Sequence, residues 1–375
     1  MPTTKADLPS PALVLDLDRF EANIKKLAEF GRGSGRGLRP HAKTHKCPEI
    51  AKRQIAAGAL GISASTVAEA EGLAAAGIRG ILLTSPIVEK GKIVRMVELA
   101  RHDPELMLSV GHAREAELLA AVAEGAGVDV GVLVDVDVGD HRTGITPGEP
   151  ALELAKFLGR SKRLRVRGVQ AYAGSASHVV GFAAREKYSR DVMARAVETR
   201  RQLQSVGFDA AILSGGSTGT YNIDGALEGM TELQCGSYVF MDVDYRRIGG
   251  RDGATYADFQ PSLKVLSTVV STTVDDRVTI DAGTKAIDTT TSYAPVVEDR
   301  PEIIYKRAGD EFGIVTVDRE TGDGGSLPKI GERIEFIVPH CDPTVCLHDR
   351  IYACRGETVE GVWPIVARRE TAFSK

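Results

Sequence analysis

Lys43 is the residue whose type and position best suit covalent chemistry. It lies in the run Arg39-Pro40-His41-Ala42-Lys43-Thr44-His45-Lys46, which directly follows an apolar stretch. A lysine amine at the end of a buried strand can form an imine with a carbonyl compound. Most lysines are solvated surface residues, so position alone leaves both interpretations open.

A glycine-rich segment suits a phosphate group. The run Ser214-Gly215-Gly216-Ser217-Thr218-Gly219-Thr220 has small side chains that let backbone N–H groups approach an anion, and the pair Gly236-Ser237 adds a second small polar site. A glycine-rich segment taken alone is more often a simple turn. We nevertheless predict a phosphate site here.

Two residues near the C-terminus have the spacing of metal ligands. In an extended segment His340 and Asp342 would face the same side and could share one cation, with Cys341 pointing away. An incidental His and Asp in a loop is the alternative. Zinc bound through Cys341, Cys346 and His348 would match no common structural zinc spacing.

The elements that must position these residues form two groups. Over the first 260 residues, apolar strand-like segments alternate with amphipathic helical ones, which predicts βα units and a (β/α)8 TIM-type barrel. An open doubly wound sheet is the alternative. The predicted barrel strands are 38–42, 60–64, 80–84, 106–110, 130–136, 166–172, 210–213 and 233–240.

The pattern changes near residue 260, where strand-like segments follow one another without a long helix. We therefore predict a C-terminal all-β domain, joined by a first strand at residues 11–17. The predicted division is a barrel over residues 18–258 and a β-rich domain built from 1–17 with 259–375. In such a barrel the site lies at the carboxyl ends of the strands, where Lys43 and the glycine-rich segment fall.

Composition excludes several classes of protein. The net charge of −4 over 375 residues gives no sign of a nucleic-acid partner or an anionic membrane surface. No apolar run approaches the roughly 18–20 residues of a membrane helix, and the N-terminus lacks the apolar core of a signal peptide. Five cysteines, an odd number, read as reduced thiols. We expect a cytoplasmic protein.

Together these segments resemble one known family. The Lys43 run, Gln170-Ala171-Tyr172, the glycine-rich segment, Glu232–Tyr238 and Asp281-Ala282-Gly283 look like the D-threonine aldolase and D-serine dehydratase group. These are fold-type III pyridoxal-phosphate enzymes related to the alanine racemase barrel, and the resemblance covers nearly the whole chain.

The resemblance implies a role for each site residue. Lys43 would hold the cofactor as a Schiff base, Arg142 would contact its phenolic oxygen, and Tyr172 would lie near the pyridine nitrogen. His340 and Asp342 match the divalent-metal pair of the aldolases, whereas the dehydratases resemble His-x-Cys there. The phosphate would be surrounded by Gly216, Ser217, Thr218, Gly219, Gly236, Ser237 and Tyr238.

The same resemblance implies a D-threonine aldolase that cleaves small D-3-hydroxy-amino acids to glycine and an aldehyde. The hard Asp342 carboxylate favours Mn²⁺ or Mg²⁺ over zinc. His178 is our first candidate for the general base and a metal-bound water is the second, and His178 could instead be a plain loop histidine. Ser63–Thr66 and Thr84–Pro86 carry smaller groups than typical aldolases at positions expected to contact substrate.

Other activities stay open at this stage. A D-serine or 3-hydroxyaspartate dehydratase is the nearest alternative. A racemase gives a metal pair no clear role, and a non-catalytic pyridoxal-phosphate carrier would not need the β-rich domain. A homodimer is expected from the resemblance to this fold type.

Overall fold

The computed structural model describes residues 3–318 and 326–368. It divides into two compact units, one formed by Lys25–Gly236 with Val366–Lys375 and the other by Met1–Ile24 with Ser237–Ile365. The sequence-based boundaries at residues 17/18 and 258/259 stay a prediction.

The first unit is a barrel of parallel strands in the order β2-β9-β8-β7-β6-β5-β4-β3. The two ends of this order also meet. The backbone N–H of Ser63 in β3 donates to the carbonyl of Pro40 at 2.8 Å, and a parallel bridge joins Ser63 to His41, so β3 pairs with the segment that follows β2 and closes the barrel. The strands are β2 (Gly37–Leu38), β3 (Ser63–Ala64), β4 (Leu82–Leu83), β5 (Met107–Val110), β6 (Val130–Val136), β7 (Leu164–Ala171), β8 (Ile212–Gly215) and β9 (Glu232–Leu233). The predicted barrel is confirmed.

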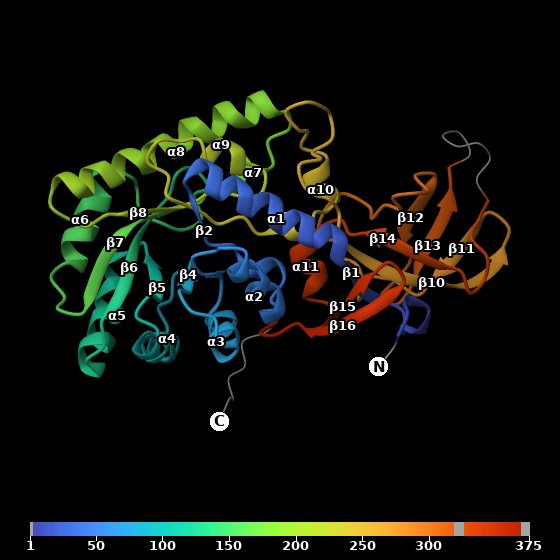
Figure 1. The fold of residues 1–375 in the computed structure, drawn as a ribbon, viewed down its shortest axis with the longest axis horizontal. Helices are drawn as coiled ribbons and strands as arrows, with labels where there is room; N and C mark the ends of the chain where they lie inside the picture. The colour runs from blue at the N-terminus through green and yellow to red at the C-terminus, as the bar shows by residue number, and fades with distance from the viewer. Residues whose placement is uncertain (1–2, 319–325, 369–375) are drawn as a thin grey trace. The chain divides into compact units, whose positions relative to one another are not determined.

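Helices cover the outside of these strands (Figure 1). Their buried apolar residues face strands that are mostly buried and rich in Val, Leu and Ile. The helices of this unit are α2 (Pro48–Ala56), α3 (Val67–Ala75), α4 (Lys90–His102), α5 (Ala113–Ala126), α6 (Glu149–Leu158), α7 (Gly174–Ser177), α8 (Phe182–Ser205) and α9 (Tyr221–Asp224), and α1 (Leu17–Ser34) belongs to it from Lys25 onward.

Four predicted strands are much shorter than expected. The segments 60–64 and 80–84 are strands only at Ser63–Ala64 and Leu82–Leu83, and the other two end in turns. The segment 38–42 is a strand only to Leu38, and Ala42–Thr44 form a 3-10 turn, η2. The segment 233–240 ends as a strand at Leu233, and Ser237–Val239 form the 3-10 turn η3. A short buried apolar run does not distinguish a strand from a buried turn, which explains the errors at these two turns.

The second unit is built on a mostly antiparallel sheet in the order β12-β13-β11-β10-β1-β15-β16, with β14 also paired to β10. The N-terminal strand β1 (Ala12–Asp16) lies between β10 and β15 and pairs with both. The others are β10 (Leu263–Val274), β11 (Arg277–Ile280), β12 (Ile303–Arg307), β13 (Gly313–Val317), β14 (Arg333–Ile337), β15 (Arg350–Arg355) and β16 (Thr358–Pro364).

Two short helices interrupt this unit, namely α10 (Val243–Arg246) and α11 (Cys341–Val345). The expectation of an extended His340–Asp342 segment is wrong, because α11 begins directly after His340. Only His340 has extended backbone, with φ −142° and ψ 135°. No helix among the described residues combines the length and apolarity that a bilayer crossing requires.

Candidate active site

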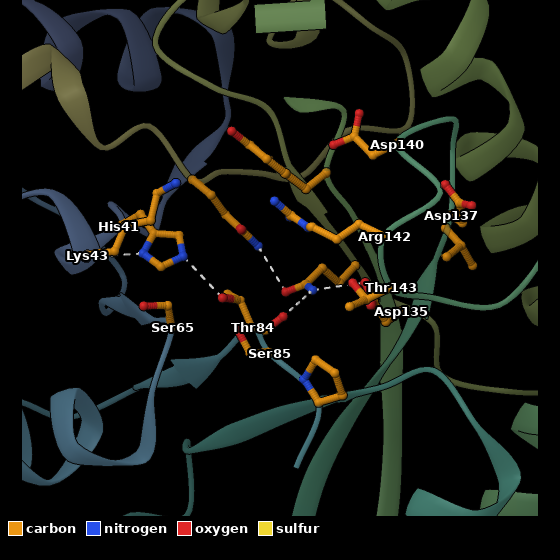
Figure 2. A pocket seen from close by; sticks show the side chains of 15 residues that line it. His41, Lys43, Ser65, Thr84, Ser85, Asp135, Asp137, Asp140, Arg142 and Thr143 are labelled. Carbon is orange, nitrogen blue, oxygen red and sulfur yellow. Dashed lines mark hydrogen bonds between the residues drawn. The ribbon is translucent and has the colours of Figure 1, made fainter. Parts of the chain in front are cut away.

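The barrel unit contains a cavity of about 370 Å³ at the carboxyl ends of its strands. That volume falls in the range of small-ligand sites. Figure 2 shows side chains from several strand ends pointing into it. Its lining comprises His41, Lys43, Ser65, Thr84, Ser85, Pro86, Asp135, Val136, Asp137, Asp140, Arg142, Thr143, Gln170, Tyr172 and Gln234.

Three residues predicted from the sequence meet at this cavity. Nζ of Lys43 lies 5.8 Å from the centroid of the Tyr172 ring, and the guanidinium carbon of Arg142 lies 5.6 Å from the same centroid. Tyr172 follows β7 and Arg142 lies in the loop after β6, so the barrel brings together residues about 130 positions apart in the chain. Lys43 and Arg142 thus place two cations beside one aromatic ring, where they could bind an anionic cofactor, and Asp135, Asp137 and Asp140 line the same cavity.

His41 fixes the backbone that carries Lys43. It is the N-cap of turn η2, and its Nδ1 accepts the backbone N–H of Lys43 at 3.3 Å. Its Nε2 lies 3.1 Å from Oγ1 of Thr84 (Figure 2). The Thr84 hydroxyl itself donates to the carbonyl of Ala64 at 3.1 Å. Because the Thr84 hydroxyl donates its only proton to the carbonyl of Ala64, it must accept from Nε2 of His41. The His41 ring is therefore the Nε2–H tautomer.

A polar network forms another wall of the cavity. Nε2 of Gln170 donates to Oδ1 of Asp135 at 2.9 Å and to the carbonyl of Thr84 at 3.0 Å. Burial raises the pKa of Asp135, while hydrogen bonds from Gln170 and Thr143 and the charge of Arg142 act in the opposite direction. Sequence reasoning did not single out Asp135, which sits inside an otherwise apolar strand, and that position was the available signal.

The glycine-rich segment forms the turn after β8. Gly216 has φ +74°, a conformation that favours glycine, and a Cβ there would lie 3.0 Å from Leu233. Sγ of Cys235 donates to the carbonyl of Ser217 at 3.3 Å, and Oγ1 of Thr220 accepts the backbone N–H of Ser217 at 3.2 Å. Gly216–Gly219 do not belong to the cavity lining, although Gln234 beside them does.

The second phosphate candidate, Gly236, packs against the turn that holds Lys43. A Cβ on Gly236 would lie 2.6 Å from Oγ1 of Thr44 and 3.3 Å from the carbonyl oxygen of His41. Thr44 is fully buried, and its hydroxyl has no hydrogen-bond partner among the described residues. An unsatisfied buried hydroxyl is costly, so it marks a place where a bound acceptor would be favourable.

These features fit pyridoxal phosphate. The cavity has an amine at its wall, small residues next to it, two cations at one ring, and a buried hydroxyl that needs an acceptor. Our sequence analysis did not predict a role for Thr44. Its position directly after Lys43 was the only sequence signal for such a role.

His178 does not line the cavity, but the short helix that it ends is hydrogen-bonded to a residue that does. It is the C-cap of the short helix α7, and the first two N–H groups of that helix, those of Gly174 and Ser175, donate to the carboxylate of Asp140 at 2.7 and 2.9 Å. Asp140 is part of the cavity lining. The catalytic role of His178 therefore stays a prediction.

The remaining predicted residues belong to the other unit. Ser237 and Tyr238 are buried in η3, where the Tyr238 ring packs edge-on against Phe259 at 5.6 Å. His340 and Asp342 flank Cys341 at the start of α11. No group of three or more His, Cys, Asp or Glu side chains that could hold a metal occurs in residues 3–318 and 326–368.

His340 nevertheless has the support typical of a metal ligand. Nδ1 of His340 lies 2.9 Å from Oδ2 of Asp242, a residue with no exposed surface. Burial alone would favour the neutral ring, but the hydrogen bond and charge of Asp242 raise the pKa of His340 to about 9. A carboxylate on Nδ1 would leave Nε2 as the nitrogen for a metal, and Asp342 could add a hard oxygen donor two residues later.

Comparison with known proteins agrees with this geometry. The model of the alanine racemase N-terminal domain matches residues 15–244, and that of a putative serine dehydratase domain matches residues 262–354. The crystal structure of D-threonine aldolase from Filomicrobium marinum superposes with a TM-score of 0.90 at 35% identity, covering 98% of this chain and 97% of that one.

Three curated relatives span almost the same length. The chain is 36% identical to D-threonine aldolase of Arthrobacter sp. and 33% identical to 3-hydroxy-D-aspartate aldolase of Paracoccus denitrificans (strain Pd 1222), each covering 97% of this chain and 93% of the relative. It is 32% identical to D-threo-3-hydroxyaspartate dehydratase of Delftia sp. (strain HT23), over 89% of both chains.

The chain therefore belongs to the fold-type III pyridoxal-phosphate enzymes with an alanine-racemase-type barrel. Within them it falls among the lyases that include D-threonine aldolase and the 3-hydroxyaspartate aldolases and dehydratases.

Proposed function

We propose that this protein is a D-threonine aldolase that depends on pyridoxal phosphate and a divalent cation, Mn²⁺ before Mg²⁺. Its substrates would be small D-3-hydroxy-amino acids. The observation that carries the choice is the donor pair at the start of α11, where an imidazole directed by Asp242 is followed by the carboxylate of Asp342. Carboxylate oxygen suits Mn²⁺ and Mg²⁺, whereas a thiolate at that position would suit zinc.

The barrel residues would hold the cofactor and the amino acid. When bound, pyridoxal phosphate supplies a ring that stores the electron pair of the broken bond. Lys43 would hold it covalently through Nζ, and Arg142 would bind its phenolic oxygen. Ser217, Thr218, Gly219, Gly236, Ser237 and Tyr238 would surround the phosphate with Gly216. Ser65, Thr84, Ser85 and Pro86 line the cavity and would contact the substrate side chain.

His340 and Asp342 would hold the cation, whose charge favours ionisation of a hydroxyl group. His178 would accept the proton of the substrate β-hydroxyl. The Cα–Cβ bond then breaks, an aldehyde leaves, and Cα takes up a proton to give glycine. Replacing His178 by Ala should lower kcat about 10²–10⁴-fold, the usual contribution of a general base. Near-wild-type turnover in that variant would remove His178 from the mechanism.

The deciding experiment identifies products from D-threonine. Purified protein with pyridoxal phosphate and Mn²⁺ should give glycine and acetaldehyde, and EDTA should abolish both while added Mn²⁺ restores them. L-Threonine serves as the stereochemical control. A holoenzyme that releases neither product from any D-3-hydroxy-amino acid would refute the proposal.

A dehydratase is the second candidate, supported by the match of residues 262–354 to the putative serine dehydratase domain. It would release ammonia and 2-oxobutanoate from the same D-threonine. The variant Asp342→Cys sharpens the choice because it creates the His-x-Cys pair that we expect of the dehydratases. If Asp342 sets the aldolase reaction, this variant should lose Mn²⁺-supported cleavage. If it keeps full Mn²⁺-supported turnover, Asp342 is not the ligand.

A further inference from the structure

Among the described residues, Arg185 is the largest side chain that is fully buried, and the proposed chemistry gives it no role. It lies in the first turns of α8, in the barrel unit. Arginine stays ionised in proteins, so burying a guanidinium is costly unless its N–H groups find acceptors. What those N–H groups bind therefore indicates what the residue is for.

The guanidinium binds the backbone of two separate loops. Its Nε donates to the carbonyl of Gly219 at 2.8 Å, and its Nη1 donates to the carbonyl of Val179 at 2.9 Å. Gly219 ends the glycine-rich turn after β8, and Val179 directly follows His178. One planar group thus joins the loop expected at the cofactor phosphate to the loop that carries the expected base.

A second contact from α8 supports the glycine-rich turn. One helical turn after Arg185, Oγ of Ser189 donates to Oδ1 of Asp224 at 2.6 Å, and Oδ2 of Asp224 accepts from Thr220. Oγ1 of Thr220 lies 3.0 Å from Oγ of Ser217 in that turn. The start of α8 therefore fixes both ends of the turn, Ser217 through Asp224 and Gly219 through Arg185.

We propose that Arg185 is a positioning residue that holds the glycine-rich turn and the His178 loop in a single relative arrangement. Only a planar fork with two donors in fixed directions can bind both carbonyls at once, which a lysine ammonium cannot reproduce. The part concerning His178 rests on the proposed function, whereas the part concerning cofactor affinity rests only on the pyridoxal-phosphate family.

The test compares Arg185→Met with Arg200→Met. Arg200 lies on the same helix and also binds backbone carbonyls, those of Ala210, Ala211 and Gly229, but these precede β8 and β9 at the opposite ends of the strands. Both variants should lower Tm. Arg185→Met should also raise the Kd of pyridoxal phosphate about tenfold or more, as loss of hydrogen bonds to a charged group predicts. Arg200→Met should leave that Kd within about twofold.

Two further measurements separate positioning from simple loss of stability. At saturating pyridoxal phosphate, kcat on D-threonine should fall about tenfold in Arg185→Met, and the visible circular dichroism of the bound cofactor should change. Arg185→Lys keeps charge and length, and it should not restore kcat. If Arg185→Met does not fold, Arg185→Lys is compared with Arg200→Met in its place.

Equal Kd, kcat and cofactor dichroism in the Arg185 and Arg200 variants would overturn the proposal. A wild-type protein that binds pyridoxal phosphate but cleaves no 3-hydroxy-amino acid would refute the proposed function alone, and the Kd comparison would still decide the role of Arg185.

Discussion

The carboxylate of Asp242 orients the ring of His340. Its Oδ2 lies 2.9 Å from Nδ1 of His340 and accepts the backbone N–H of Cys341 at 3.0 Å, while Oδ1 accepts the backbone N–H of Tyr245 at 2.9 Å. Two backbone N–H groups, one on each carboxylate oxygen, thus hold the carboxylate in place, and it in turn orients the ring. In the proposed metal site, Nε2 of His340 would then be the nitrogen that binds the cation.

Asp242→Asn should weaken metal binding. An amide at this position no longer provides the charge that fixes the ring tautomer, and the loss of such an outer partner typically costs 10–100-fold in affinity, or about 1.4–2.7 kcal/mol. Calorimetric titration of the metal-free protein with Mn²⁺ measures the change in affinity.

Asp281→Asn is the matched control for that variant. Asp281 lies in the same unit and accepts hydrogen bonds from Ser267 and from the backbone of Thr268, at 2.9 and 2.8 Å. It should lower Tm without changing Mn²⁺ affinity. Equal affinities in the two variants would show that Asp242 does not serve a metal ligand.

Lys43→Ala should abolish covalent attachment of pyridoxal phosphate. Borohydride reduction of the wild-type holoenzyme should fix the cofactor to the peptide containing Lys43, as mass spectrometry can show. Lys46, three residues later, is buried in an ion pair with Glu69 and should not be labelled. Lys52→Ala, at an exposed position on α2, is the control. Labelling of another lysine in the wild-type protein would contradict the assignment.

Thr84→Val should lower kcat by about tenfold, whereas Thr84→Ser should stay near wild type. Valine has no oxygen to accept a hydrogen bond from Nε2 of His41. The His41 ring, whose Nδ1 accepts the backbone N–H of Lys43, then loses the partner that fixes its tautomer. Initial rates at saturating cofactor and D-threonine measure kcat. Serine keeps the hydroxyl, and equal kcat values for the two variants would exclude a role for this hydrogen bond.

Glu115 should make the stability of the barrel depend on pH. Burial raises its pKa from 4.5 to about 7, although its carboxylate accepts the N–H groups of Ile87 and Gly111 at 3.1 and 3.0 Å. Between these pH values the folded state holds a proton that the unfolded state has lost. Its stabilising contribution is therefore complete below pH 4.5 and is lost as the pH rises through 7.

Glu115→Gln mimics the protonated group at every pH. Relative to wild type, this variant should gain free energy of unfolding between pH 5 and pH 8, by at most about 3 kcal/mol. Urea unfolding at the two pH values measures the difference, and any constant cost of the amide cancels. Glu117→Gln, an exposed neighbour on α5, is the control. A pH-independent difference between Glu115→Gln and wild type would contradict the raised pKa.

The sequence by itself determined the class of fold. The alternation of apolar runs with 3.6-residue periodicity predicts βα units, and β6 was predicted with its observed bounds, Val130–Val136. The resemblance of the chain to a known family then implied roles for Lys43, Arg142 and Tyr172, and each of these residues follows a strand whose carboxyl end faces the site. These signals are local, so one chain is enough to read them.

Only the tertiary structure decided how the side chains meet. The Nε2–H tautomer of His41, the unsatisfied hydroxyl of Thr44 and the two carbonyls bound by Arg185 depend on contacts between segments far apart in the chain. The orientation of His340 by Asp242, 98 residues earlier, is of the same kind. Hydrogen-bond geometry is set within a few tenths of an ångström by packing, and residue spacing along the sequence carries no such information.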